Sequence, residues 1–247
     1  MGKQKQIITV WENAAAMAAA AAHAFVQDAN QAIASHGQFT IALSGGNTPA
    51  AFFRELSQPA FSRNIPWHKI NVCWSDERWV AHDHPDSNFR MAKENLLDHA
   101  PLTASHIHPI PFRGKPEQAA AKYEQAIRRI LKRSNGAFDW IMLGLGNDGH
   151  TASLFPGTAV LSEKKKWVSA VWVEEKQTHR ISFTYPLINR AAKTVFLVSG
   201  PEKAAIVSAL LGKAGSKNKF PAARVNPVKG INCWFLDAAS ASGIQAG

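Results

Sequence analysis

The segment 144–150, which reads GLGNDGH, holds the residue types that proton-transfer chemistry needs. It follows an apolar run, 138–143, that predicts a strand. Asp148 and His150 lie two positions apart on a glycine turn that frees the backbone. Such a pair can act as a general base, in which the histidine takes a proton from water and the carboxylate orients the ring or supports its charge. The alternative is a histidine with a purely structural place in a loop.

The same segment also matches GxGxxG, the pattern of dinucleotide-binding turns. A dinucleotide-binding unit needs a full helix after the third glycine, and an acidic residue about twenty positions further on. Here Pro156 and Gly157 end any helix after about two turns. No acidic residue clearly occupies the position expected about twenty residues further on. The match is therefore weak evidence for a dinucleotide site.

The segment 44–49, SGGNTP, runs from an apolar strand into a helix. Two glycines allow the backbone to approach a ligand closely, and the start of a helix presents free N–H groups to an anion. No Gly-Lys-Ser/Thr follows, so this is not a Walker loop. The pattern is typical of a phosphate-binding loop, although an ordinary strand–helix turn would read the same way.

A third polar segment, SDERW at 75–79, follows the apolar run 70–74. Three charges at a strand end are costly to bury unless they are paired or used. Arg78 could hold a phosphate or a developing oxyanion through its fork of donors, and a network of ion pairs is the alternative. The nearby segment 82–84, His-Asp-His, has short spacing and a Pro-containing context. That context favours a solvated loop over a metal site.

Elements that alternate between strand and helix must position these three segments. This alternation predicts an α/β fold with a mostly parallel, Rossmann-like open sheet and helices on both faces. Ligands of such sheets bind beyond the carboxyl ends of the strands, so the three segments are expected to meet there. The expected strands are 39–43, 70–74, 138–143, 167–173, 181–183, 194–198 and 231–236. The expected helices are 14–36 (capped by Asn13 and ended by Gly37), 49–56, 88–97, 117–131 and 204–211.

The chain has 247 residues and a net charge of +10, which allows nucleic acid, a membrane surface or a phosphorylated small molecule as partner. We find no long basic stripe or nucleic-acid-reading motif, and no stretch of about 20 apolar residues. Cys73 and Cys233 lie within predicted strands and are expected to be buried reduced thiols. The segment 213–229, rich in Lys, Gly, Asn and Pro, predicts a mobile surface loop.

Taken together, several motifs resemble the 6-phosphogluconolactonase family. They occur in the order of that family and cover most of the chain, and GLGNDGHTASLFPG is the most specific of them. The matching motifs are SGGNTP (44–49), SDER (75–78), DSNFRMAKENLL (86–97), LGLGNDGHTASLFPGT (143–158), HRISFTYPLINRA (179–191) and GPEKAAIV (200–207).

The resemblance implies a cytoplasmic hydrolase, a single domain over 1–247, that converts 6-phospho-D-glucono-1,5-lactone to 6-phospho-D-gluconate. This is the second step of the oxidative pentose phosphate pathway. The resemblance implies no cofactor and no metal, a small phosphosugar lactone rather than nucleic acid or membrane as partner, and a monomer or weak dimer. It makes His150 the catalytic base and Asp148 its carboxylate. The substrate- and phosphate-binding residues that it implies are Gly45, Gly46, Asn47, Thr48, Arg78, Arg180 and, by likeness to the related deaminases, Lys203.

The closest alternative is a glucosamine-6-phosphate deaminase-like isomerase, a family that shares the fold and a similar Asp-Gly-His turn. In that family a glutamate follows the histidine by five residues, and here the position is Phe155. An apolar residue cannot relay the protons that ring opening requires. The resemblance therefore favours the lactonase.

Overall fold

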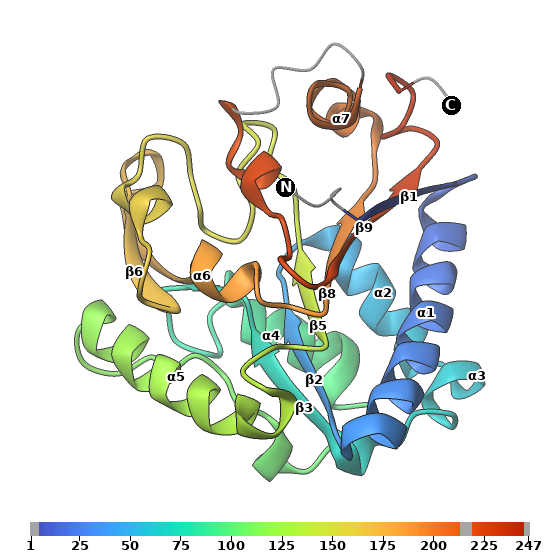
Figure 1. The fold of residues 1–247 in the computed structure, drawn as a ribbon, viewed down its shortest axis with the longest axis horizontal. Coiled ribbons are helices and arrows are strands. Elements are labelled where there is room, and N and C mark those ends of the chain that lie inside the picture. The colour runs from blue at the N-terminus through green and yellow to red at the C-terminus, as the bar shows by residue number, and fades with distance from the viewer. Residues whose placement is uncertain (1–4, 213–218, 245–247) are drawn as a thin grey trace.

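A six-stranded sheet forms the centre of the molecule in the computed structural model, which describes residues 5–212 and 219–244 (Figure 1). All neighbouring strands in this sheet run parallel, as the sequence predicted. The buried strands are apolar on both faces, which is typical of a parallel sheet covered on both sides. In sheet order the strands are β1 (Gln6–Trp11), β9 (Ile231–Asp237), β8 (Lys193–Val198), β5 (Trp140–Leu143), β2 (Phe39–Leu43) and β3 (Ile70–Trp74).

Helices cover the sheet, with α1, α2 and α3 on one side and α5 on the other (Figure 1). The side chain of Asn13 caps α1 by accepting a hydrogen bond from the N–H of Ala16 at 2.9 Å, and Gly37 ends the helix with φ of 85°. Both ends of this helix were predicted. The helices are α1 (Ala14–His36), α2 (Asn47–Ser57), α3 (Pro59–Ser62), α4 (Asn88–Ala92), α5 (Pro116–Ile130), α6 (Tyr185–Ile188) and α7 (Ala204–Leu211).

A second, antiparallel sheet stands beside the first. The sequence predicted strands at 167–173 and 181–183, which form two of its members, but not the third strand or their pairing as a separate sheet. Its order is β4 (Asp76–Arg78), β7 (Thr178–Phe183) and β6 (Val168–Val173). The segment 76–78 was expected to be a loop, because charged residues rarely read as a strand. It forms a strand because its backbone pairs with β7, which the local sequence does not reveal.

Two further expectations need correction. The edge strand β1 was not predicted, and the expected helix 88–97 is α4 followed by a π-helical turn, Lys93–Leu97. In β1 apolar residues occur at consecutive positions and stay largely exposed, so neither strand nor helix periodicity marks it.

The segment 219–225 packs against the catalytic candidates, although 213–229 was expected to be a mobile surface loop. Residues 213–218 lie outside the described part of the chain. Pro221, Ala222 and Val225 are buried, and the N–H of Ala222 donates to the carbonyl oxygen of Gly149 at 2.9 Å. The prediction of a surface loop is therefore wrong for this part, because its apolar residues fill space under the turn at 146–150.

Cys73 and Cys233 are free and buried, as predicted. Burial raises the pKa of the Cys73 thiol far above its ordinary value. Within residues 5–212 and 219–244, none of the helices combines the length and the apolar character of a membrane span.

Candidate active site

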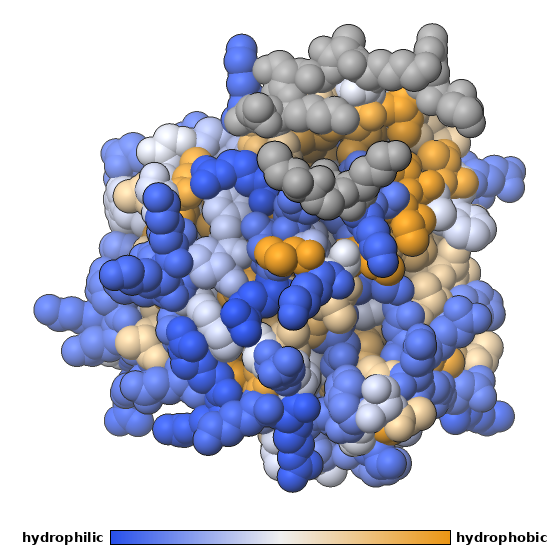
Figure 2. Space-filling model, viewed as in Figure 1, coloured by the Kyte–Doolittle hydropathy of each residue, from blue (hydrophilic) through white to orange (hydrophobic). Residues whose placement is uncertain are grey.

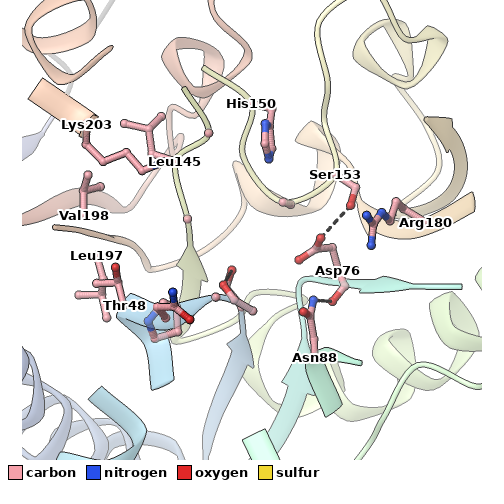
Figure 3. Close-up of a pocket in the computed structure, with 18 of the residues that line it drawn as sticks. Thr48, Asp76, Asn88, Leu145, His150, Ser153, Arg180, Leu197, Val198 and Lys203 are labelled. Carbon is pink, nitrogen blue, oxygen red and sulfur yellow. Dashed lines mark hydrogen bonds between the residues drawn. The ribbon is translucent and has the colours of Figure 1, made fainter. Parts of the chain in front are cut away.

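A cavity of about 430 Å³ opens at the carboxyl ends of β2, β5 and β8, beside β4 and β7 (Figure 3). The three polar segments found in the sequence all contribute to its wall, so the expected position at this edge of the sheet is confirmed. Asp148 lies outside the wall. The predicted residues that line the cavity are Gly45, Gly46, Asn47, Thr48, Arg78, His150, Arg180 and Lys203.

The imidazole of His150 is held by its neighbours and points into the cavity (Figure 3). Its Nδ1 lies 2.6 Å from Oδ1 of Asp148, and Phe155 stacks on the ring with the centroids 4.1 Å apart. An ionised carboxylate only accepts hydrogen bonds, so Nδ1 carries the proton of the neutral ring. The lone pair is then on Nε2, the nitrogen remote from Asp148, where it can take a proton from water.

Two glycines of this turn allow close packing around it. A Cβ on Gly146 would lie 2.1 Å from Nδ1 of His150 and 2.5 Å from Oδ1 of Asp148. Gly149 has φ of +77°, and a Cβ there would lie 2.5 Å from the ring of Phe220. Gly146 therefore makes room for the contact between carboxylate and imidazole, and Gly149 makes room for Phe220 against the turn.

The segment 44–49 leads into α2, with Gly46 at the N-cap position and φ of 110°. Gly46 offers no side chain to the N–H groups of the first helical turn, which suits an anionic ligand at this end of the helix. The hydroxyl of Thr48 lies 2.9 Å from that of Ser199, which joins this loop to the end of β8.

Arg180 brings a positive charge to the other side of the cavity. Its Nε and Nη1 are buried and have no hydrogen-bond partner among the described residues. It stands directly across the strand pair from Arg78, whose guanidinium donates to the backbone oxygen of Asp86. Burial, and then the charge of Arg78, lower the pKa of Arg180. Two guanidinium groups facing one another favour an anion between or beside them.

Lys203 contacts the segment 144–150. Its Nζ donates to Oδ1 of Asn147 at 2.8 Å. Both residues were predicted to bind substrate, and the structure brings them into contact with each other.

The two carboxylates of the segment 75–79 have different surroundings. Glu77 is buried and accepts hydrogen bonds from the N–H groups of Asn88 and Phe89, so it fixes the start of α4, and burial raises its pKa. Asp76 instead lines the cavity, as does Asn88. Sequence reasoning missed both as site residues. Neighbouring charges in one short motif gave no signal of which would face the cavity.

Comparisons with known proteins identify the family of this chain. The sequence model described as glucosamine-6-phosphate isomerases/6-phosphogluconolactonase matches residues 12–234. A 6-phosphogluconolactonase of Synechocystis sp. is 44% identical over 211 residues, which are 84% of this chain and 85% of that one. The structure of 6-phosphogluconolactonase from Trypanosoma brucei has a TM-score of 0.82 at 25% identity and covers 98% of this chain and 100% of its own.

A monomeric glucosamine-6-phosphate deaminase has a TM-score of 0.81 at 20% identity, covering 96% of this chain and 99% of its own, and at that distance the likeness shows the fold alone. The family match spans most of the chain, and it includes both the Asp148–His150 pair and the segment 44–49. This chain therefore belongs to the glucosamine-6-phosphate isomerase/6-phosphogluconolactonase family.

Proposed function

We propose that this protein hydrolyses 6-phospho-D-glucono-1,5-lactone to 6-phospho-D-gluconate, the second step of the oxidative pentose phosphate pathway. The observation that carries the proposal is the Asp148–His150 pair. Nδ1 of His150 lies 2.6 Å from Oδ1 of Asp148, and the ring points into a cavity that Arg180 also lines. The 44% identical Synechocystis sp. relative is named 6-phosphogluconolactonase, which supports the same activity.

In the proposed reaction, Nε2 of His150 takes a proton from a water molecule as its oxygen attacks the lactone carbonyl carbon. The carbonyl oxygen becomes an oxyanion in the tetrahedral intermediate. As the intermediate collapses, the bond to the ring oxygen breaks, and the imidazolium returns its proton to that oxygen. Asp148 keeps the ring in the productive tautomer and stabilises its positive charge. A lactone is an activated ester, so a covalent enzyme intermediate is unnecessary.

The phosphate group of the substrate is proposed to bind to the positive groups of the cavity. The first turn of α2 offers N–H groups after Gly46, and Arg78 and Arg180 offer charged donors. Lys203 lies on the same cavity wall as the end of β8 and adds a further positive charge. Because this binding is the same before and after the chemical step, it is expected to lower KM more than it raises kcat.

The test is a lactonase assay on freshly generated 6-phosphogluconolactone, corrected for spontaneous hydrolysis. The unmodified protein should accelerate hydrolysis, and unphosphorylated gluconolactone should be a poor substrate. Replacement of His150 by Ala should lower kcat by roughly two to four orders of magnitude. A His150→Ala protein with near-normal turnover, or equal efficiency on both lactones, would contradict the proposal.

The buried free thiols of Cys73 and Cys233 support a reducing compartment, and we place the protein in the cytoplasm. We further propose that it works as a monomer or a weak dimer, which sedimentation at several protein concentrations would test.

A further inference from the structure

One carboxylate in the cavity has no place in the mechanism described above. Asp76 lines the cavity and is only 8% exposed, and it stands on the same side as Ser153 and Arg180, with Thr48 and Lys203 on the opposite side (Figure 3). A negative charge in a cavity that receives a phosphate dianion is unfavourable unless it does something else. The contacts of Asp76 indicate what that is.

Asp76 is held firmly at both its side chain and its backbone. Its Oδ2 accepts a hydrogen bond from the hydroxyl of Ser153 at 2.7 Å. Its backbone oxygen accepts one from Nδ2 of Asn88 at 2.9 Å. Asn88 in turn packs so closely on Gly45 that a Cβ there would lie 1.8 Å from its Oδ1. The carboxylate is therefore positioned in advance rather than free to turn away.

The other oxygen of this carboxylate, Oδ1, has no hydrogen-bond partner in the described part of the chain. Among the described residues, Asp76 forms no ion pair with Arg78 or Arg180. Its negative charge does raise the pKa of Arg180, which partly offsets the effect of burial. Asp76 thus presents a fixed acceptor to the cavity, and an acceptor of this kind is matched only by a ligand that donates.

A phosphate dianion carries acceptors only, so it cannot bind Asp76. The hydroxyl groups on the lactone ring are donors. We propose that Asp76 accepts a hydrogen bond from a ring hydroxyl of the substrate and so selects hydroxylated sugar lactones over deoxy ones, with Ser153 and Asn88 as positioning residues. This assignment rests on the proposed function and extends it from the phosphate and the carbonyl to the hydroxylated part of the substrate.

The test measures kcat/KM for 6-phosphogluconolactone and for its freshly prepared 2-, 3- and 4-deoxy analogues. The unmodified protein should lose roughly tenfold to a hundredfold in kcat/KM with the analogue that lacks the bound hydroxyl, as hydrogen bonds to a charged group require. In Asp76→Asn and Asp76→Ala, the kcat/KM values for the parent lactone and for that analogue should differ by no more than about threefold. Asp76→Asn keeps the shape and an acceptor for Ser153, so it remains informative if Asp76→Ala does not fold.

Glu202→Gln is the matched control, because Glu202 is another carboxylate of the same cavity but lies beside Lys203. It should keep the full preference for the hydroxylated substrate. Competitive inhibition by inorganic phosphate should be no weaker in Asp76→Asn than in the unmodified protein, because the change removes a negative charge from the cavity that receives the anion.

Two outcomes would overturn the assignment. One is an Asp76 variant that loses activity by the same factor on every lactone, which would mean a structural or proton-transfer role. The other is unmodified protein that does not discriminate against any deoxy analogue. If the unmodified protein hydrolysed none of the lactones, the proposed function itself would fail, which is a different result from an active enzyme without discrimination.

Discussion

Asp148 contacts both the imidazole and the backbone N–H of His150 but does not line the cavity, so its effect is expected to pass through His150. An asparagine at this position can still accept a hydrogen bond from Nδ1, but it no longer stabilises the charge that the ring gains. Asp148→Asn should therefore lower kcat by roughly tenfold to a hundredfold, less than His150→Ala does. Initial rates on freshly generated lactone measure both. If Asp148→Asn proved the more damaging change, the base would be Asp148 rather than His150.

Gly146 is expected to be essential for a steric reason. A Cβ on Gly146 would lie 2.1 Å from His150 and 2.5 Å from Asp148, which leaves no room for a methyl group. Gly146→Ala should therefore push the pair apart and lower kcat at least tenfold. Gly144→Ala is the matched control, because a Cβ there would meet its nearest neighbour, Ser44 Oγ, at an ordinary 3.7 Å. Circular dichroism would confirm that both variants fold. Equal activity of the two variants would contradict the explanation.

Contacts between residues that lie close in sequence could be predicted from the sequence alone. Asp148 and His150 are two positions apart, and segment 44–49 carries its loop and helix start together, so residue type and order were enough to predict the contact and the turn. Asp76 could not be separated from Glu77 in the same way. These two residues have different roles because they bind different partners, and those partners come from other segments of the chain. Asp76 accepts a hydrogen bond from Ser153, and Glu77 accepts hydrogen bonds from the N–H groups of α4.

At the scale of the elements, the β4–β7 pair sets Arg78 opposite Arg180, an arrangement that favours a bound anion. Inorganic phosphate at about 100 times its Kd should stabilise the protein by about 2.7 kcal/mol and raise Tm by several degrees. Arg180→Met should lose most of this increase. Arg54→Met, a change to an exposed arginine on α2, should keep it. Differential scanning calorimetry at constant ionic strength makes the comparison, and an undiminished shift in Arg180→Met would place the anion elsewhere.

The same pair of elements shows why β4, and with it the second sheet, was not predicted. The strands of the large sheet carry apolar runs, such as the fully buried β2, that mark them directly. The three residues of β4 are charged, and they form a strand only because β7, about a hundred residues later, pairs with them. The segment 219–225 was missed for a similar reason, since it is its distant contact with Gly149 that orders it.

The fold of the whole molecule does not by itself decide between lactonase and deaminase, because a deaminase shares it. The position five residues after His150 does bear on the choice, and there the ring of Phe155 stacks on the imidazole at 4.1 Å. We expect no ammonia from glucosamine-6-phosphate, even at high enzyme concentration, in a coupled glutamate dehydrogenase assay. Phe155→Glu alone should not create the activity, because the remaining residues around the substrate are not arranged for that reaction. Ammonia release by the unmodified protein at a rate comparable to lactone hydrolysis would reverse the choice.

The pairing of β1 with β9 has a consequence for synthesis on the ribosome. Because β1 lies at the sheet edge, its one neighbour in the described structure is β9, with Gln6 opposite Asn232. At about 5–20 residues per second, β1 waits roughly 10–50 s for that partner to be made. Ile7, Val10 and Trp11 remain about half exposed or somewhat less even in the finished fold, and apolar surface gathers over this edge of the molecule (Figure 2). A nascent chain stalled before residue 231 would therefore carry an unpaired apolar strand, the kind of segment that chaperones bind and that otherwise seeds aggregation.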